Sequence, residues 1–193
     1  MDKSNGYEGI ASIFLRSRGI AIDGIGKSSV RKWAQTIQPG SVILDIGCGT
    51  GIPVSRVLTD EGLMVYGIDA SPTLAHAFHQ NFPDLPIACE AAEDSTFFDR
   101  QFDGIISIGL MFLLSEESQI MLIYKAAMVL KSGGKFLFTA TYRAHTWNDV
   151  MTEQRSISLG AEKYKELFAA SGLSFIEEWT DEGGNYHFNA GKI

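Results

Sequence analysis

The amino-acid sequence predicts an α/β fold, a doubly wound and mostly parallel sheet with helices on both faces. Two observations lead to this prediction. From about residue 41 onward, short apolar runs alternate with helical segments, the order that builds a parallel sheet. The last two runs flank the turn Glu182-Gly183-Gly184, which predicts a closing antiparallel hairpin. We expect one domain over residues 1–193, with 1–40 as an N-terminal helical lid or cap and 41–193 as the core.

The expected strands are short runs in which β-branched and aromatic residues recur. They lie at residues 42–46, 64–68, 87–89, 102–108, 135–141, 174–180 and 186–190.

Capping residues mark the ends of the helices between these strands. Ser71 predicts an N-cap, and Pro83 ends that helix at the preceding residue. Ser115 predicts the cap of a long helix, which we expect Ser132-Gly133-Gly134 to end because glycine adopts positive φ easily. A last helix is expected over 161–171, with glycine after it.

Composition narrows the classes of partner. The chain carries 23 Asp and Glu against 16 Lys and Arg, a formal net charge of −7. Nucleic-acid binding needs clustered basic residues, so we expect no nucleic-acid partner. No apolar run reaches the roughly 18 residues of a membrane span, and two cysteines exclude a disulfide scaffold. We therefore expect a cytoplasmic protein, a monomer or homodimer, with a small-molecule substrate and no membrane association.

A glycine-rich turn, Gly47-Cys48-Gly49-Thr50-Gly51, follows the first expected strand. Ligands of doubly wound sheets bind at the carboxyl ends of the strands, where glycines let them approach backbone N–H groups. The dinucleotide pattern G-x-G-x-x-G would place its last glycine at Ile52. The turn therefore disfavours a nicotinamide or flavin cofactor.

Asp69 ends the second expected strand. A carboxylate at this place can accept hydrogen bonds from both hydroxyls of a ribose. Without a phosphate-binding partner, the pattern suggests a nucleoside ligand rather than a nucleotide. The alternative is that Asp69 merely caps the helix that begins near Ser71.

Four ordered segments resemble the class I S-adenosylmethionine-dependent methyltransferases. These segments are 42–51, 65–71, 102–106 and 130–137. The resemblance implies a Rossmann-like, seven-stranded sheet, the cofactor S-adenosyl-L-methionine and the product S-adenosyl-L-homocysteine. It also implies transfer of a methyl group to an acceptor that the sequence does not identify.

The resemblance assigns cofactor-binding residues by their matching positions. Along the methionyl part it implies Asp45, Gly47, Cys48 and Gly49. At the ribose and adenine it implies Asp69, Ala70, the backbone N–H of Ala92 and the side chain of Glu93. Near the methionyl amine it implies the backbone of Ile108 and Gly109. The family often has an acid before the last Ala-Glu pair, where this chain has Ala91.

We expect the acceptor to contact the N-terminal segment and residues 142–149. His145 or Tyr142 is the candidate that orients or deprotonates it, although a histidine without a role fits equally well. No metal site is expected, because His76 and His79 lack a third ligand.

Three other functions stay open. The first is a non-catalytic S-adenosylmethionine-binding regulatory or partner module, which would share the cofactor residues but show no turnover. The second is a nicotinamide oxidoreductase, which Ile52 disfavours. The third is aminopropyl transfer, which needs acidic residues that the segment 107–112 does not offer.

Overall fold

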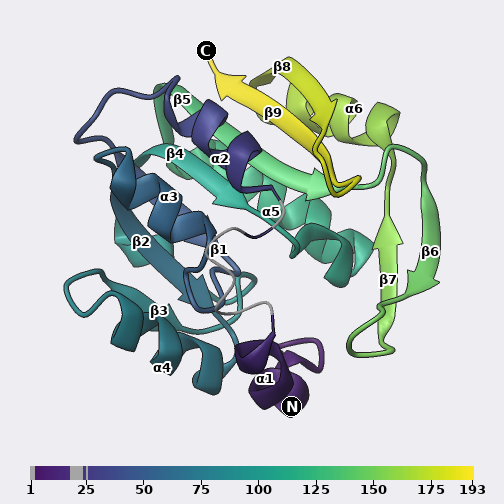
Figure 1. Ribbon diagram of the computed structural model, residues 1–193. Helices are drawn as coiled ribbons and strands as arrows, with labels where there is room; N and C mark the ends of the chain where they lie inside the picture. Colours follow the sequence, from purple (N-terminus) through teal and green to yellow (C-terminus); the bar gives the residue numbers. More distant parts are fainter. Residues whose placement is uncertain (1–2, 18–23, 25) are drawn as a thin grey trace.

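The computed structural model describes residues 3–17, 24 and 26–193. The described residues form a seven-stranded sheet in the order β3-β2-β1-β4-β5-β9-β8, with helices on both faces (Figure 1). Strand β9 is antiparallel to both β5 and β8, while the other neighbouring strands are parallel. The predicted Rossmann-like sheet with an antiparallel C-terminal hairpin is confirmed.

The strands of the main sheet are β1 (Val42–Ile46), β2 (Met64–Asp69), β3 (Ile87–Cys89), β4 (Phe102–Ser107), β5 (Leu130–Ala140), β8 (Leu173–Thr180) and β9 (Tyr186–Lys192). The helices are α1 (Tyr7–Arg16), α2 (Lys27–Ala34), α3 (Val54–Asp60), α4 (Pro72–Asn81), α5 (Glu116–Val129) and α6 (Ala161–Ser171). Two short 3₁₀ turns are η2 (Phe97–Asp99) and η3 (Met111–Leu113).

A hydrophobic core lies on each face of the sheet. Trp33 and Val57, from α2 and α3, pack with Ile43 of β1 on one face. Phe138 of β5 packs with Tyr164 of α6 on the other, where α5 also lies. Strands β1 and β4 are buried by both layers, which explains why most of their residues are apolar.

Most capping predictions are confirmed. The hydroxyl of Ser71 accepts a hydrogen bond from the N–H of Leu74, and Gly172 ends α6 with φ 79°. The predicted end of the long helix at 132–134 is wrong. Helix α5 ends at Val129 because Leu130 already has extended backbone and pairs with Phe102 of β4.

A two-stranded hairpin that the sequence did not predict follows β5. It consists of β6 (His145–Asn148) and β7 (Arg155–Ser158), and it stands apart from the main sheet (Figure 1). The buried side chain of Gln119 anchors it, donating to Ile157 O at 2.9 Å and Leu114 O at 3.0 Å. The hydroxyl of Tyr164 donates to Gln119 Oε1 at 2.6 Å, so α5 and α6 both hold the hairpin.

The N-terminal segment contains the helices α1 and α2, so its predicted helical character is confirmed. Helix α1 lies against α4, at the bottom of Figure 1, while α2 packs on α3. Residues 1–2, 18–23 and 25 of the expected cap lie outside the described residues. The division into a cap and a core stays a prediction.

Candidate active site

The carboxyl ends of β1, β2 and β4 meet at one edge of the sheet. The strand order reverses there, between β1 and β4, and ligands of such sheets bind at this place. A cavity of about 20 Å³ lies at the edge. Its lining brings together five residues that the sequence assigned to the cofactor, namely Gly47, Asp69, Ala70, Ala92 and Glu93.

The glycine turn after β1 depends on positive φ. Gly47, Gly49 and Gly51 have φ of 73°, 56° and 76°, a region that disfavours other residues. A Cβ at Gly51 would also lie 2.4 Å from Phe82. The amides of Gly47 and Cys48 both donate to Ile68 O, so the turn is tied to β2. The spacing G-x-G-x-G is therefore required by the backbone itself.

The carboxylate of Asp69 is held by two backbone amides. Gly49 N–H donates to Oδ2 at 2.7 Å, and Ser71 N–H donates to Oδ1 at 2.9 Å. Burial raises the pKa of Asp69, although these two hydrogen bonds oppose the shift. Asp69 therefore does accept from the start of α4, as the alternative interpretation held, and it also lines the cavity.

Asp45 and Cys48 lie deeper than the cavity. The hydroxyl of Ser55 donates to Asp45 Oδ2 at 2.6 Å, and Asp45 is 1% exposed. Burial raises the pKa of Asp45 to about 7, with a smaller contribution from the charge of Asp69. Burial also raises the pKa of the Cys48 thiol. Among the described residues, neither belongs to the cavity lining, so the structure brings them to the turn but not to its open surface.

Among the described residues, Ile108 and Gly109 after β4 do not belong to the cavity lining. The amide of Gly109 donates to Thr139 Oγ1 at 2.8 Å, which ties the segment to β5. Leu110 and Leu114 line the cavity, whereas Ile108 packs with the core beneath α2 and α3. Leu110 also approaches Gly47, where a Cβ would lie 3.0 Å from its own Cβ.

Tyr142 and His145 lie away from this cavity. The ring of Tyr142 is 5.3 Å from that of Tyr186 on β9. His145 stacks on Trp147 at 4.7 Å and contacts Arg143 O through Nδ1 at 3.0 Å. It lines a separate groove of about 420 Å³ beside the hairpin. In the parts of the chain that the structure describes, neither side chain reaches the residues around Asp69.

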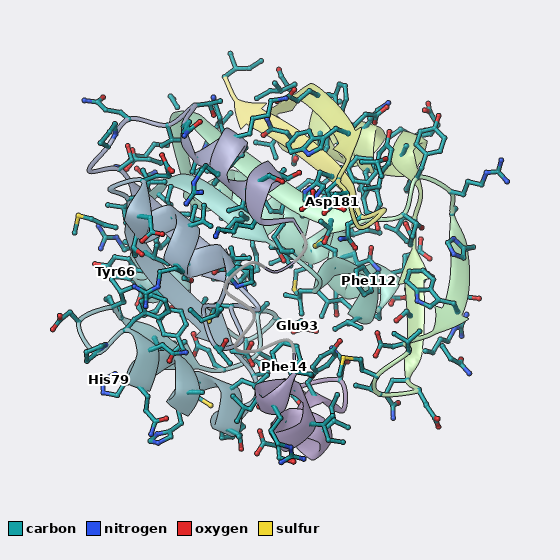
Figure 2. The ribbon with its side chains drawn as sticks, viewed as in Figure 1. Phe14, Tyr66, His79, Glu93, Phe112 and Asp181 are labelled. Carbon is teal, nitrogen blue, oxygen red and sulfur yellow. The ribbon has the colours of Figure 1, made fainter. Side chains whose placement is uncertain are left out.

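An aromatic series connects the two regions. The ring of Phe112, on η3 next to the cavity, lies 5.5 Å from that of Trp147 on β6. Trp147 in turn stacks on His145. Figure 2 shows Phe112 on the side of the hairpin, and Glu93 on the side of α1, which carries Phe14. The contact between Phe112 and Trp147 depends on the hairpin, which the sequence did not predict.

Sequence reasoning missed several polar residues around the site. Lys3 lines the cavity and forms an ion pair with Asp94. Glu8 of α1 accepts hydrogen bonds from Ser71 Oγ and from both the amide and hydroxyl of Thr73. These contacts join positions more than 60 residues apart, so no local pattern signals them.

Among the described residues, no group of three or more His, Cys, Asp or Glu could hold a metal ion, and no helix is long and apolar enough to cross a membrane.

Residues 43–134 match the family described as "Methyltransferase domain". An uncharacterized methyltransferase of Synechocystis sp. is 30% identical over 58% of this chain and 52% of its own length. A probable tRNA methyltransferase 9B of Homo sapiens is 33% identical over 56% of this chain and 23% of its own length. The chain thus spans about half the length of the first relative and about a quarter of the second.

Solved structures share the fold over nearly the whole chain. Magnesium protoporphyrin IX methyltransferase from Synechocystis, with bound SAM, has a TM-score of 0.71 at 16% identity, covering 96% of this chain and 97% of the other. At this identity the likeness concerns the fold. Residues 43–134 therefore match a methyltransferase domain, and the chain shares the fold of the solved methyltransferases to which it is similar.

Proposed function

We propose that this chain transfers the methyl group of S-adenosyl-L-methionine to a small-molecule acceptor in the cytoplasm. The observation that carries the proposal is the juxtaposition of Asp69 with the glycine turn, joined by the hydrogen bond from Gly49 to Asp69 Oδ2. A partly buried carboxylate suits a ribose, and the positive-φ glycines beside it let the methionyl part of the cofactor approach the backbone closely.

The residues of the site fit such a cofactor. Each oxygen of Asp69 accepts one backbone hydrogen bond, and a carboxylate oxygen has a second lone pair that can accept a ribose hydroxyl. Ala92 and Glu93 would hold the adenine, and Gly47 with Gly49 would lie along the methionyl part. When bound, the cofactor supplies a methyl group already activated by its sulfonium. Leu110 and Leu114 would exclude water from it, which favours a reaction in which the sulfur loses its positive charge.

The cavity must widen to admit this cofactor. Ligand sites usually measure about 300–1,000 Å³, against about 20 Å³ here. Phe14 of α1 lies over the glycine turn, 3.8 Å from the place of a Cβ on Gly49. Lys3 and Glu8 tie the same segment to the site. We therefore propose that α1 is a lid that moves when the cofactor enters.

The acceptor side of the proposal rests on the series Phe112, Trp147 and His145. Phe112 lies between the cavity-lining residues Leu110 and Leu114 in the chain, and the partly exposed rings of Phe112 and Trp147 offer a stacking surface for an acceptor. His145, at its exposed end, is the residue we propose to orient or deprotonate that acceptor, with Tyr142 as the second candidate. His145→Ala is expected to lower kcat at least about tenfold, with the affinity for S-adenosylhomocysteine unchanged.

A pool screen tests the acceptor class. The full chain is incubated with methyl-labelled S-adenosylmethionine and separate pools of metabolites, tRNA and peptides. We expect label in the metabolite pool. Label confined to tRNA, the acceptor that one relative's name suggests, would contradict the small-molecule proposal and keep the methyltransferase. Cofactor binding with no label in any pool would favour the regulatory module.

A further inference from the structure

One lysine clasps the loop that follows β3. Lys125 of α5 directs its Nζ at three backbone carbonyls, those of Ala92 at 2.8 Å, Glu93 at 3.1 Å and Ser95 at 2.8 Å. The same Nζ lies 4.5 Å from the centre of the Phe97 ring. A lysine ammonium has three donors, so these carbonyls use all of them.

The loop has a conformation that needs such support. Phe97, Phe98 and Asp99 have φ of 54°, 58° and 49°, which is unfavourable for residues other than glycine. The amides of Asp94 and Ser95 turn back to Ala91 O, and the hydroxyl of Ser95 accepts from Phe97 N–H. Within the described part of the chain, no hydrogen bond uses the amides of Ala92 and Glu93. The hydrogen bonds from Lys125 thus hold the three carbonyls toward α5 and leave the amides of Ala92 and Glu93 available to another partner.

The positive charge of Lys125 also acts on the carboxylates near the cavity. Burial lowers the pKa of Lys125, and the charges of Glu93, Asp94 and Glu90 oppose this shift. Glu90 and Glu93 line the cavity together with Asp69. Without a cation, these carboxylates would repel one another at short range. Lys125 lowers that repulsion from the side of α5, as Lys3 does for Asp94 from the side of α1.

We infer that Lys125 is a positioning residue for adenine recognition. It fixes the backbone of loop 91–95 so that the Ala92 amide and the Glu93 side chain meet the edge of the purine. The chain has Ala91 where an acid often stands in relatives of this fold, so base recognition relies more on the position of the backbone. The inference rests on the proposed cofactor site and adds a residue from a helix that does not line the cavity.

Calorimetric titration with two ligands tests the inference. S-adenosylhomocysteine carries adenine, whereas S-inosylhomocysteine has a carbonyl in place of the exocyclic amine. A site that hydrogen-bonds the purine edge should bind the first at least about tenfold more tightly. Lys125→Met keeps the stem against Phe97 and removes the donors. We expect it to raise the Kd for S-adenosylhomocysteine about tenfold and to change that of the inosine analogue little, so that the ratio falls.

Lys165→Met is the matched control, because Lys165 also bonds a polar partner, Glu178, and lies 4.7 Å from an aromatic ring, that of Phe175. It should leave both constants unchanged, and Lys125→Arg should restore the discrimination. If Lys125→Met does not fold, Lys125→Gln replaces it. An unchanged ratio of the two constants, including an equal loss of both affinities, overturns the inference.

Failure of the cofactor site itself would look different. Asp69→Ala should weaken both ligands to the same extent, because both carry the ribose. If Asp69→Ala weakens neither, the proposed cofactor site is wrong. If it weakens both while Lys125→Met keeps their ratio, the inference on Lys125 alone is wrong.

Discussion

At the scale of single residues, Asp69 has two tasks that the structure makes compatible. It accepts the amides of Gly49 and Ser71, which fixes the turn and the start of α4. Its remaining lone pairs are those proposed to bind the ribose.

Asp69→Ala should weaken S-adenosylhomocysteine binding by about 1.5–3 kcal/mol, the scale of hydrogen bonds to a charged group. Calorimetry checks this, with the exposed Asp84→Ala as control. An unchanged Kd in a folded variant would remove the ribose assignment.

Asp45 makes stability depend on pH. Burial raises its pKa to about 7 in the folded chain, whereas an unfolded carboxyl titrates near 3.8. The folded state therefore binds the proton more tightly. The resulting stabilisation is complete below about pH 4 and is lost as pH rises to about 7.

Asp45→Asn should accordingly remove this loss. The asparagine side chain can still accept from Ser55 Oγ and carries no charge to bury. Urea denaturation at about pH 5 and about pH 7 should show a free energy of unfolding that falls less with pH in the variant than in the wild type. Equal falls in both proteins would mean that Asp45 does not titrate in this range.

At the scale of elements, the hydrogen bonds that Glu8 of α1 accepts from Ser71 and Thr73 at the start of α4 form the latch that would hold the proposed lid closed. Glu8 places a carboxylate at the N-terminus of α4, where the helix dipole and the Thr73 amide favour it. Glu8→Gln should raise the dissociation rate of S-adenosylhomocysteine several-fold, since a neutral amide holds the latch less firmly. Stopped-flow measurement checks the rate, and Glu166→Gln on the exposed face of α6 is the control. An unchanged rate would show that α1 does not gate the site.

The elements also show what a sequence can predict. The seven main strands followed from local signals, because the central runs β1, β4 and β5 are largely buried and the helices between strands begin at recognisable caps such as Ser71. The glycine turn could be predicted because its positive φ values favour glycine, and Asp69 because it ends strand β2 beside that turn. The hairpin of β6 and β7 was missed because β6 is largely exposed and Gln119, which anchors the hairpin, lies far away in sequence. Lys125 and Glu8 read as ordinary surface charges until tertiary contacts give them partners.

At the scale of the whole molecule, two regions share one edge of the sheet. The glycine turn, Asp69 and the loop after β3 form the proposed cofactor side, and the hairpin forms the proposed acceptor side. Phe112 joins them through its contact with Trp147. The net charge of −7 also suits a cofactor that carries a positive sulfonium.

Binding of an adenosyl thioether at the glycine turn is the central claim, and one calorimetric comparison tests it most directly. The full chain is titrated with S-adenosylhomocysteine and, separately, with NAD. The account predicts one molecule of the thioether bound per chain and no heat from NAD. Saturable NAD binding without binding of S-adenosylhomocysteine would contradict it, because the turn would then hold a dinucleotide.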